Sequence, residues 1–202
     1  ILLIATAMLS LTELTWRRVL IIGSVGAVGL LIAWRVLMRE YQQERIDVWL
    51  DPEAHADAGG YQILQARAAV GNGGIFGRGA NQGTQNVLDF VPYGESDFVL
   101  AVFAEEWGYL GTTLVLLLFM SLVLWSLNIA SQARDRFSAH LCVGVGALIF
   151  LHTVLNVGVV LEFFPNTGLP LPFFSNGGSN VLTVMFGLGV LMSVSRTRHR
   201  RS

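Results

Sequence analysis

Three carboxylates stand where a polar, glycine-rich segment of this 202-residue chain runs into a long apolar stretch. Asp97 follows Ser96, a residue type that often caps a helix N-terminus, so Asp97 is expected to open a helix. Glu105 and Glu106 follow two turns later, inside the apolar run. Carboxylates in or beside a membrane helix are costly and usually mark a working site. The helix dipole alone also stabilises a first-turn acid, so both interpretations of Asp97 stay open, while the glutamate pair favours function.

The composition predicts a membrane protein. Hydrophobic residues make up 53% of the chain and charged residues 13%, with a mean hydropathy of +0.57. Soluble domains carry about a quarter charged residues. The net charge of −1 gives no basic field for nucleic acid, and no nucleic-acid partner is expected. Cys142 is the only cysteine, which excludes a disulfide within the chain and a cysteine-based metal site.

The glycine-rich run from Gly71 to Gly79 does not carry a nucleotide-binding pattern. Its spacing matches neither GxGxxG nor the Walker motif, and no organic cofactor is expected. Glycines that permit tight turns and close packing explain the run at least as well as ligand contact does.

The apolar runs predict an all-α integral membrane protein with about four full spans and one truncated span. A full span needs about 20 apolar residues, and the first run is too short, so the chain is expected to be a fragment. A large loop is expected to contain an amphipathic helix at 61–70. The expected elements are a truncated span at 1–14, spans at 19–38, 97–130, 139–163 and 181–195, a large loop at 40–96, an outer loop at 164–180 and a tail at 196–202.

The arginines in the short loops predict the orientation. Arg17 and Arg18, Arg134 and Arg136, and the arginine-rich tail fall on one side, which the positive-inside rule makes cytoplasmic. The loops at 40–96 and 164–180 then face outward together, where they can meet and form one site.

The 164–180 loop is peculiar for a surface turn. Three prolines and three glycines stand among apolar residues and break the helix at membrane depth. Non-helical backbone is tolerated there only where protein buries it or where it lines a cavity. This pattern indicates a re-entrant-like loop beside a polar cavity.

The motifs in both loops, taken together, resemble the SEDS family, the shape, elongation, division and sporulation proteins of bacteria. The resemblance covers essentially the whole chain, and Gly83-Thr-Gln85 is more similar to the elongation branch (RodA) than to the division branch (FtsW). The chain departs from the family pattern at Asn176, Ser96 and residues 93–95. The motifs are Asp51-Pro52, Gly60-Tyr-Gln62, Gly71-x-Gly-Gly-x-Phe-Gly-x-Gly79, Gly83-Thr-Gln85, Phe90-x-Pro92, Asp97-Phe98-x-x-Ala101-Val-x-Ala-Glu-Glu-x-Gly108, Thr167-Gly-Leu-Pro-Leu-Pro172 and Ser175-x-Gly-Gly-Ser179.

The resemblance implies the C-terminal half of a ten-helix bundle. It implies a glycosyltransferase of the bacterial inner membrane that polymerises lipid II into peptidoglycan strands on the outer face, partnered by a class B penicillin-binding protein. The fragment alone is expected to be inactive. A divalent cation (Mg²⁺ or Mn²⁺) is a candidate cofactor, without assigned ligands.

The family's essential aspartate falls on Asp97, the expected catalytic base of an inverting transfer. Glu105 and Glu106 are expected to have supporting roles, as are Pro170, Pro172, Gly177 and Gly178. Candidate substrate contacts are Arg45, Gln62, Gln65, Arg78, Thr84, Gln85, Ser175 and Ser179.

Two other functions fit parts of the sequence. Intramembrane carboxylates with a broken loop also suit a flippase for the lipid-linked precursor. A flippase needs a cavity that reaches the cytoplasmic leaflet, yet the unusual polar residues lie outward, which favours chemistry on the outer face. A non-catalytic scaffold for a penicillin-binding protein is the third possibility, and a scaffold would tolerate loss of Asp97.

Overall fold

The computed structural model describes residues 24, 40–79, 98–174 and 178–199. The expected spans at 1–14 and 19–38, and the expected helix opening at Ser96 and Asp97, lie outside these residues. Within them every regular element is helical, which confirms the all-α class. The elements are α3 (Glu40–Leu50), a 3₁₀ turn η1 (Ala56–Ala58), α4 (Gly60–Gly73), α6 (Val99–Ser131), α7 (Arg136–Val160) and α8 (Gly178–His199).

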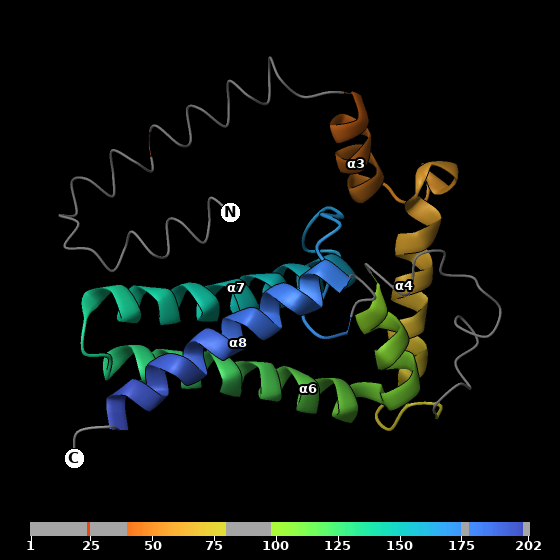
Figure 1. The fold of residues 1–202 in the computed structure, drawn as a ribbon. Coiled ribbons are helices and arrows are strands. Elements are labelled where there is room, and N and C mark those ends of the chain that lie inside the picture. Colours follow the sequence, from red (N-terminus) through yellow and green to blue (C-terminus); the bar gives the residue numbers. More distant parts are fainter. Residues whose placement is uncertain (1–23, 25–39, 80–97, 175–177, 200–202) are drawn as a thin grey trace.

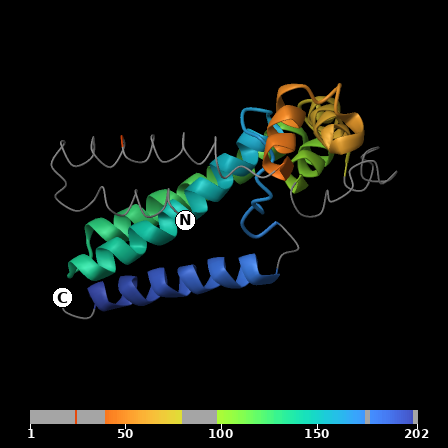
Figure 2. The same ribbon diagram turned by 90° about the horizontal axis from the view of Figure 1, so that it is seen from above.

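Three of these helices, α6, α7 and α8, are long and apolar enough to cross a membrane. At 1.5 Å per residue, the 25 residues of α7 extend about 37 Å, beyond a hydrocarbon core of about 30 Å. Figure 1 shows the start of α6, the end of α7 and the start of α8 at one end of the molecule, beside α3 and α4. The turn between α6 and α7 lies at the opposite end with the C-terminus. Figure 2 shows the same separation from above. We call these the loop end and the tail end.

Helices α6 and α7 pack closely because small residues face each other. A Cβ added to Gly146 of α7 would lie 2.1 Å from the Oγ of Ser126 in α6. Small residues let membrane helices approach, so that dispersion contacts replace the hydrophobic drive that lipid removes. Nearer the tail end, Ile129, Cys142 and Leu191 join α6, α7 and α8 in a buried apolar cluster.

The N-terminus of α7 is capped by Asp135, whose carboxylate accepts a 2.8 Å hydrogen bond from the backbone N–H of Ser138. This bond, with a second one from the Ser138 hydroxyl, holds the pKa of Asp135 below its ordinary value. The cap satisfies one of the N–H groups that a helix start leaves without a partner.

The described part of the proline- and glycine-rich loop runs without helix from the end of α7 to residue 174. Leu171 and Pro172 are buried in it. Its carbonyls receive amide side chains, with Asn156 donating to the Leu169 carbonyl at 3.1 Å and Asn180 donating to that of Leu171 at 3.4 Å. Side-chain amides thus satisfy backbone groups that the missing helix cannot.

Helix α6 differs from the continuous helix expected at 97–130. It is interrupted at Gly108, whose backbone is non-helical at φ 66° and ψ −168°. Figure 1 shows the first turns of α6 set at an angle to the rest and lying beside α4. We call residues 99–107 the short arm and residues 109–131 the long arm.

Candidate active site

The interruption of α6 is filled by residues 74–79, the segment that follows α4. In an unbroken helix the N–H groups of residues 109 and 110 would bind the carbonyls of residues 105 and 106. Here Tyr109 and Leu110 donate instead to the carbonyls of Gly74 and Ile75, at 2.9 and 3.1 Å. The freed carbonyls of Glu105 and Glu106 accept from the N–H groups of residues 78 and 79, both at 3.0 Å. The segment therefore replaces two helical hydrogen bonds with four of its own.

Glycines allow this backbone-to-backbone contact. A Cβ on Gly77 would lie 2.1 Å from the Glu106 carbonyl oxygen, and one on Gly108 would lie 2.3 Å from the Gly77 nitrogen. A Cβ on Gly73, at the end of α4, would lie equally close to the Ala104 carbonyl oxygen. The glycine-rich run thus serves close packing against α6, one of the two interpretations that the sequence left open.

The two glutamates of the short arm lie in different surroundings. Glu105 is fully buried, with 0% of its surface exposed, whereas Glu106 is partly exposed. A buried carboxylate is expensive unless its surroundings compensate for the lost water. Glu105 is therefore built into the packing at the root of the short arm.

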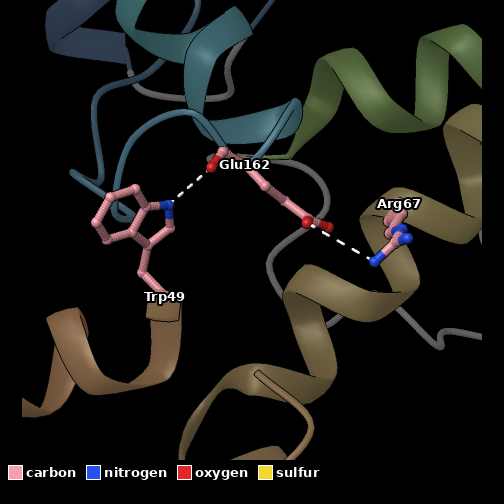
Figure 3. Close-up of polar contacts among 3 residues, drawn as sticks. All are labelled: Trp49, Arg67 and Glu162. Carbon is pink, nitrogen blue, oxygen red and sulfur yellow. Dashed lines mark hydrogen bonds and ion pairs between the residues drawn. The ribbon is translucent and has the colours of Figure 1, made fainter. Parts of the chain in front are cut away.

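The two loops predicted to face outward meet, as expected, at the loop end. The Trp49 indole Nε1 of α3 donates to the backbone carbonyl of Glu162, just past the end of α7, at 2.8 Å. The Glu162 carboxylate lies 3.9 Å from the Arg67 guanidinium of α4. Figure 3 shows Glu162 between the two helices, its carbonyl toward Trp49 and its carboxylate toward Arg67.

A third contact joins the two loops at this junction, beside a cavity. The Arg45 guanidinium donates to the Asn166 carbonyl at 2.7 Å. Beside this bond lies a cavity of about 300 Å³ with charged, amide and apolar walls. It is lined by Glu44, Arg45, Val48, Gly59, Gln62, Ile63 and Asn166.

The cavity brings together two of the candidate substrate contacts, Arg45 and Gln62. It does not include Arg78, which is exposed beside the α6 interruption with its Nε donating to the Asn72 carbonyl, or Ser179, which is exposed in the first turn of α8. Gln65 is half-buried in α4. Asp97, Thr84, Gln85, Ser175 and Gly177 lie outside the described residues, so their roles stay predictions.

The remaining supporting residues lie around the second loop. Pro172 is buried and Pro170 half-buried, whereas Gly178 is exposed at the start of α8. A packing role suits the two prolines, which continue a chain that has left its helix.

Sequence reasoning missed Trp49, Glu162 and Asn166. A lone acidic residue between an apolar span and a proline-rich loop was a visible signal for Glu162. Nothing local marked the indole of Trp49, because its partner lies 113 residues away.

A metal centre does not form within the described part of the chain. No group of three or more histidine, cysteine, aspartate or glutamate side chains converges there. The described donors therefore do not fit a divalent cation by themselves.

The fold and this loop-end site define a multi-pass α-helical membrane protein. A family model described as "Cell cycle protein", which groups FtsW, RodA and SpoVE, matches residues 1–200. The chain belongs to this family, as its motifs indicated.

Relatives from several branches of the family match most of the chain. It is 37% identical over 190 residues to peptidoglycan glycosyltransferase MrdB of Escherichia coli K12, covering 94% of this chain and 51% of that protein. It is 40% identical over 177 residues to stage V sporulation protein E of Bacillus subtilis, covering 87% and 46%. It is 36% identical over 179 residues to a probable peptidoglycan glycosyltransferase FtsW of Trichlorobacter lovleyi, covering 89% and 47%. The chain thus spans about half the length of these relatives.

A solved structure shares the fold. One chain of a peptidoglycan synthase complex, described as coordinating polymerization and crosslinking, superposes with a TM-score of 0.78 at 28% identity. The match covers 98% of this chain and 55% of that one.

Proposed function

We propose that this chain is the C-terminal half of a peptidoglycan glycosyltransferase that polymerises lipid II during cell-wall elongation. The observation that carries the proposal is the 37% identity to the glycosyltransferase MrdB over 94% of the chain. The elongation role follows from the motif at Gly83-Thr-Gln85, which is more similar to the RodA branch.

In the proposed reaction Asp97 acts as general base. Its carboxylate takes the proton from the acceptor's 4-hydroxyl as that oxygen attacks the donor's anomeric carbon. The bond from the anomeric carbon to the diphosphate breaks, the configuration inverts, and undecaprenyl diphosphate leaves with the electron pair. Asp97 lies two residues before the short arm in the sequence, and the buried Glu105 of that arm supports the proposal that this region is built to hold carboxylates.

The junction of the two loops supplies the proposed substrate surface. Arg45 lies in the cavity wall with Gln62, and a guanidinium carries five N–H donors, so a carbonyl contact and a phosphate contact are compatible. Positive charge of this kind stabilises a diphosphate leaving group. Arg78, Gln65, Thr84, Gln85, Ser175 and Ser179 complete the proposed set of contacts.

The proposed setting is the bacterial inner membrane, with the tail end cytoplasmic and the loop end on the outer face. The arginines at 134, 136 and 196 lie at the tail end, which supports this orientation under the positive-inside rule. A class B penicillin-binding protein is the proposed partner, supported by the fold shared with a chain of a peptidoglycan synthase complex.

In this proposal a divalent cation, Mg²⁺ or Mn²⁺, would bind together with the substrate's diphosphate. The substrate's phosphate oxygens would supply part of its ligands, because the described residues hold no cluster of three or more histidine, cysteine, aspartate or glutamate side chains. Chelation by EDTA followed by repletion with each metal tests this requirement directly.

The decisive experiment uses the full product of the gene in liposomes with its penicillin-binding partner. Labelled lipid II is added, and glycan polymer is resolved on a gel for the wild type and for Asp97→Asn. Polymer from the wild type and none from a folded Asp97→Asn supports both the activity and the base.

The other outcomes separate the alternatives. Polymer from both proteins removes Asp97 from the catalytic role. Absence of polymer from a wild type that binds its partner rejects the glycosyltransferase. A lipid II translocation assay then distinguishes a flippase from a scaffold.

A further inference from the structure

We propose that residues 74–79 form a backbone clamp that fixes the angle between the two arms of α6, and that Gly77 and Gly108 are positioning residues for the reaction. The clamp is the set of four hydrogen bonds that join this segment to residues 105, 106, 109 and 110. The inference rests on the proposed function for its catalytic consequence, although the clamp itself is a feature of the described backbone.

The hydrogen bonds of the clamp stabilise the interrupted conformation of α6. A break in a membrane helix leaves carbonyl and N–H groups without partners, which is unfavourable wherever water cannot bind them. The clamp pairs the two carbonyls and the two N–H groups at 105, 106, 109 and 110. Because all four partners lie within residues 74–79, the two arms are both bound to the same short segment.

Sterics make the clamp dependent on glycine at two positions. Gly77 and Gly108 have positive φ values of 79° and 66°, a region that other residues rarely adopt. A Cβ on Gly77 would lie 2.1 Å from the Glu106 carbonyl oxygen, and a Cβ on Gly108 would lie 2.3 Å from the Gly77 nitrogen. These are backbone atoms, so no side-chain rotation can relieve the overlap.

The clamp would position carboxylates that lie in the short arm or next to it in the sequence. It contains the buried Glu105 and is preceded in sequence by Asp97, the proposed base. The long arm packs in the bundle with α7 and α8, through residues such as Phe119, Val123 and Ile129. A change in the angle of the short arm would therefore displace its carboxylates relative to the long arm, α7 and α8. A misplacement of about 1 Å can lower a rate about 100-fold.

The chain offers a matched pair of glycines for the test. Gly74 and Gly77 both belong to the clamp segment and both have positive φ, 56° and 79°. A Cβ on Gly74 meets nothing within 4 Å, whereas a Cβ on Gly77 meets the α6 backbone. Both variants therefore add backbone strain within the clamp segment, and only Gly77→Ala adds a clash with the α6 backbone.

Kinetics on lipid II with the full product of the gene and its partner give the first readout. We expect Gly77→Ala to lower kcat at least about tenfold, with KM for lipid II within about twofold, because the base is misplaced while the substrate surface remains. Gly74→Ala should lower kcat less than Gly77→Ala does, because it adds backbone strain without a clash against α6. Equal losses in the two variants would overturn the proposal, since strain alone would then account for them.

The second readout is the angle itself, which a general loss of stability does not shift. Spin labels on Trp107→Cys and Leu118→Cys, in a Cys142→Ala background, report the separation of the short and long arms. Positions 107 and 118 are exposed and Cys142 is the only native cysteine. We expect Gly77→Ala to displace or broaden the distance distribution and Gly74→Ala to change it less. Wild-type distances and wild-type kcat in Gly77→Ala would overturn the clamp.

A second pair of variants tests the clamp if Gly77→Ala does not fold. Arg78→Pro deletes the N–H that binds the Glu105 carbonyl, and Arg78→Ala removes the same side chain while keeping that N–H. We expect the kcat of Arg78→Pro to lie at least about fivefold below that of Arg78→Ala. Identical kcat values would overturn the proposal. If the wild type makes no polymer the proposed function fails, and the spin-label distances still decide whether the clamp exists.

Discussion

The Trp49 indole donates a 2.8 Å hydrogen bond to the backbone carbonyl of Glu162, although 113 residues separate the two. Glu162, two residues past the end of α7, has a left-handed conformation at φ 61°, which is uncommon for a residue other than glycine. Strained backbone of this kind persists where the surroundings over-determine it. The indole and the neighbouring Arg67 supply such surroundings, so this pair fixes how the second loop leaves the membrane helix.

Trp49→Phe should destabilise the junction of the two loops. It keeps most of the aromatic bulk and removes the N–H donor, leaving the Glu162 carbonyl without its indole partner. A net loss of about 0.5–1.5 kcal/mol is expected, because the bond is partly buried and neutral. Thermal unfolding in detergent measures it, with Trp125→Phe on the half-exposed face of α6 as the control. An unchanged Tm in Trp49→Phe would show that the bond does not hold the junction.

Arg67→Gln should matter less than Trp49→Phe. The ion pair with Glu162 has a separation of 3.9 Å and an arginine side chain that is 69% exposed. Such pairs contribute about 0–1 kcal/mol and weaken further with salt. Tm measured at low and at high ionic strength checks both statements. A loss larger than that of Trp49→Phe would contradict this ranking.

Glu105→Ala should reduce stability more than Glu106→Ala. Glu105 is fully buried, so its removal leaves a void and breaks interactions that water cannot replace, at a cost of about 1–3 kcal/mol. Glu106 is partly exposed, and solvent can compensate for part of its loss. Tm values for the two variants in the same detergent decide between them. The reverse order would mean that burial does not set the role of this pair.

Gly146→Ala should loosen the contact between α6 and α7. The added methyl group would overlap the Ser126 Oγ, and overpacking of this kind costs about 1–3 kcal/mol. Gly189→Ala in α8 is a matched control, because a Cβ there meets nothing within 4 Å. The control should keep the wild-type Tm. If both variants unfold at the same temperature, the close approach of α6 and α7 contributes no stability.

Asp135 should make the stability of the α7 N-terminus depend on pH. The Ser138 N–H and hydroxyl lower the pKa of the folded carboxyl below its ordinary value of 3.8. A depressed folded pKa means that the stabilisation is fully present above 3.8 and is lost as pH falls through the folded pKa. Wild type should therefore exceed Asp135→Ala in Tm at about pH 7, and the difference should shrink below about pH 4.

A control separates the charge from the hydroxyl contact. Ser138→Ala removes the hydroxyl bond and keeps the backbone N–H bond, so it should retain part of the pH dependence. A Tm difference between wild type and Asp135→Ala that stays constant with pH would contradict the role of the ionised cap.

The amino-acid sequence by itself determined the helical membrane class and the family. Apolar runs long enough to span a bilayer predict helices, because the hydrocarbon core leaves the backbone no other way to pair its polar groups. The helices α6, α7 and α8 lie in such runs, and the proline- and glycine-rich loop is non-helical up to residue 174 where the sequence indicated a break. The catalytic assignment to Asp97 came from the motif and stays a prediction.

Only the tertiary structure decided the interruption at Gly108, the burial of Glu105 over Glu106, and the contact between Trp49 and Glu162. The apolar run continues on both sides of Gly108, and local periodicity does not reveal that another backbone segment displaces two helical hydrogen bonds. The indole of Trp49 likewise has no partner within its own helix. Each of these features depends on groups distant in sequence, whose pairing is fixed when the chain packs.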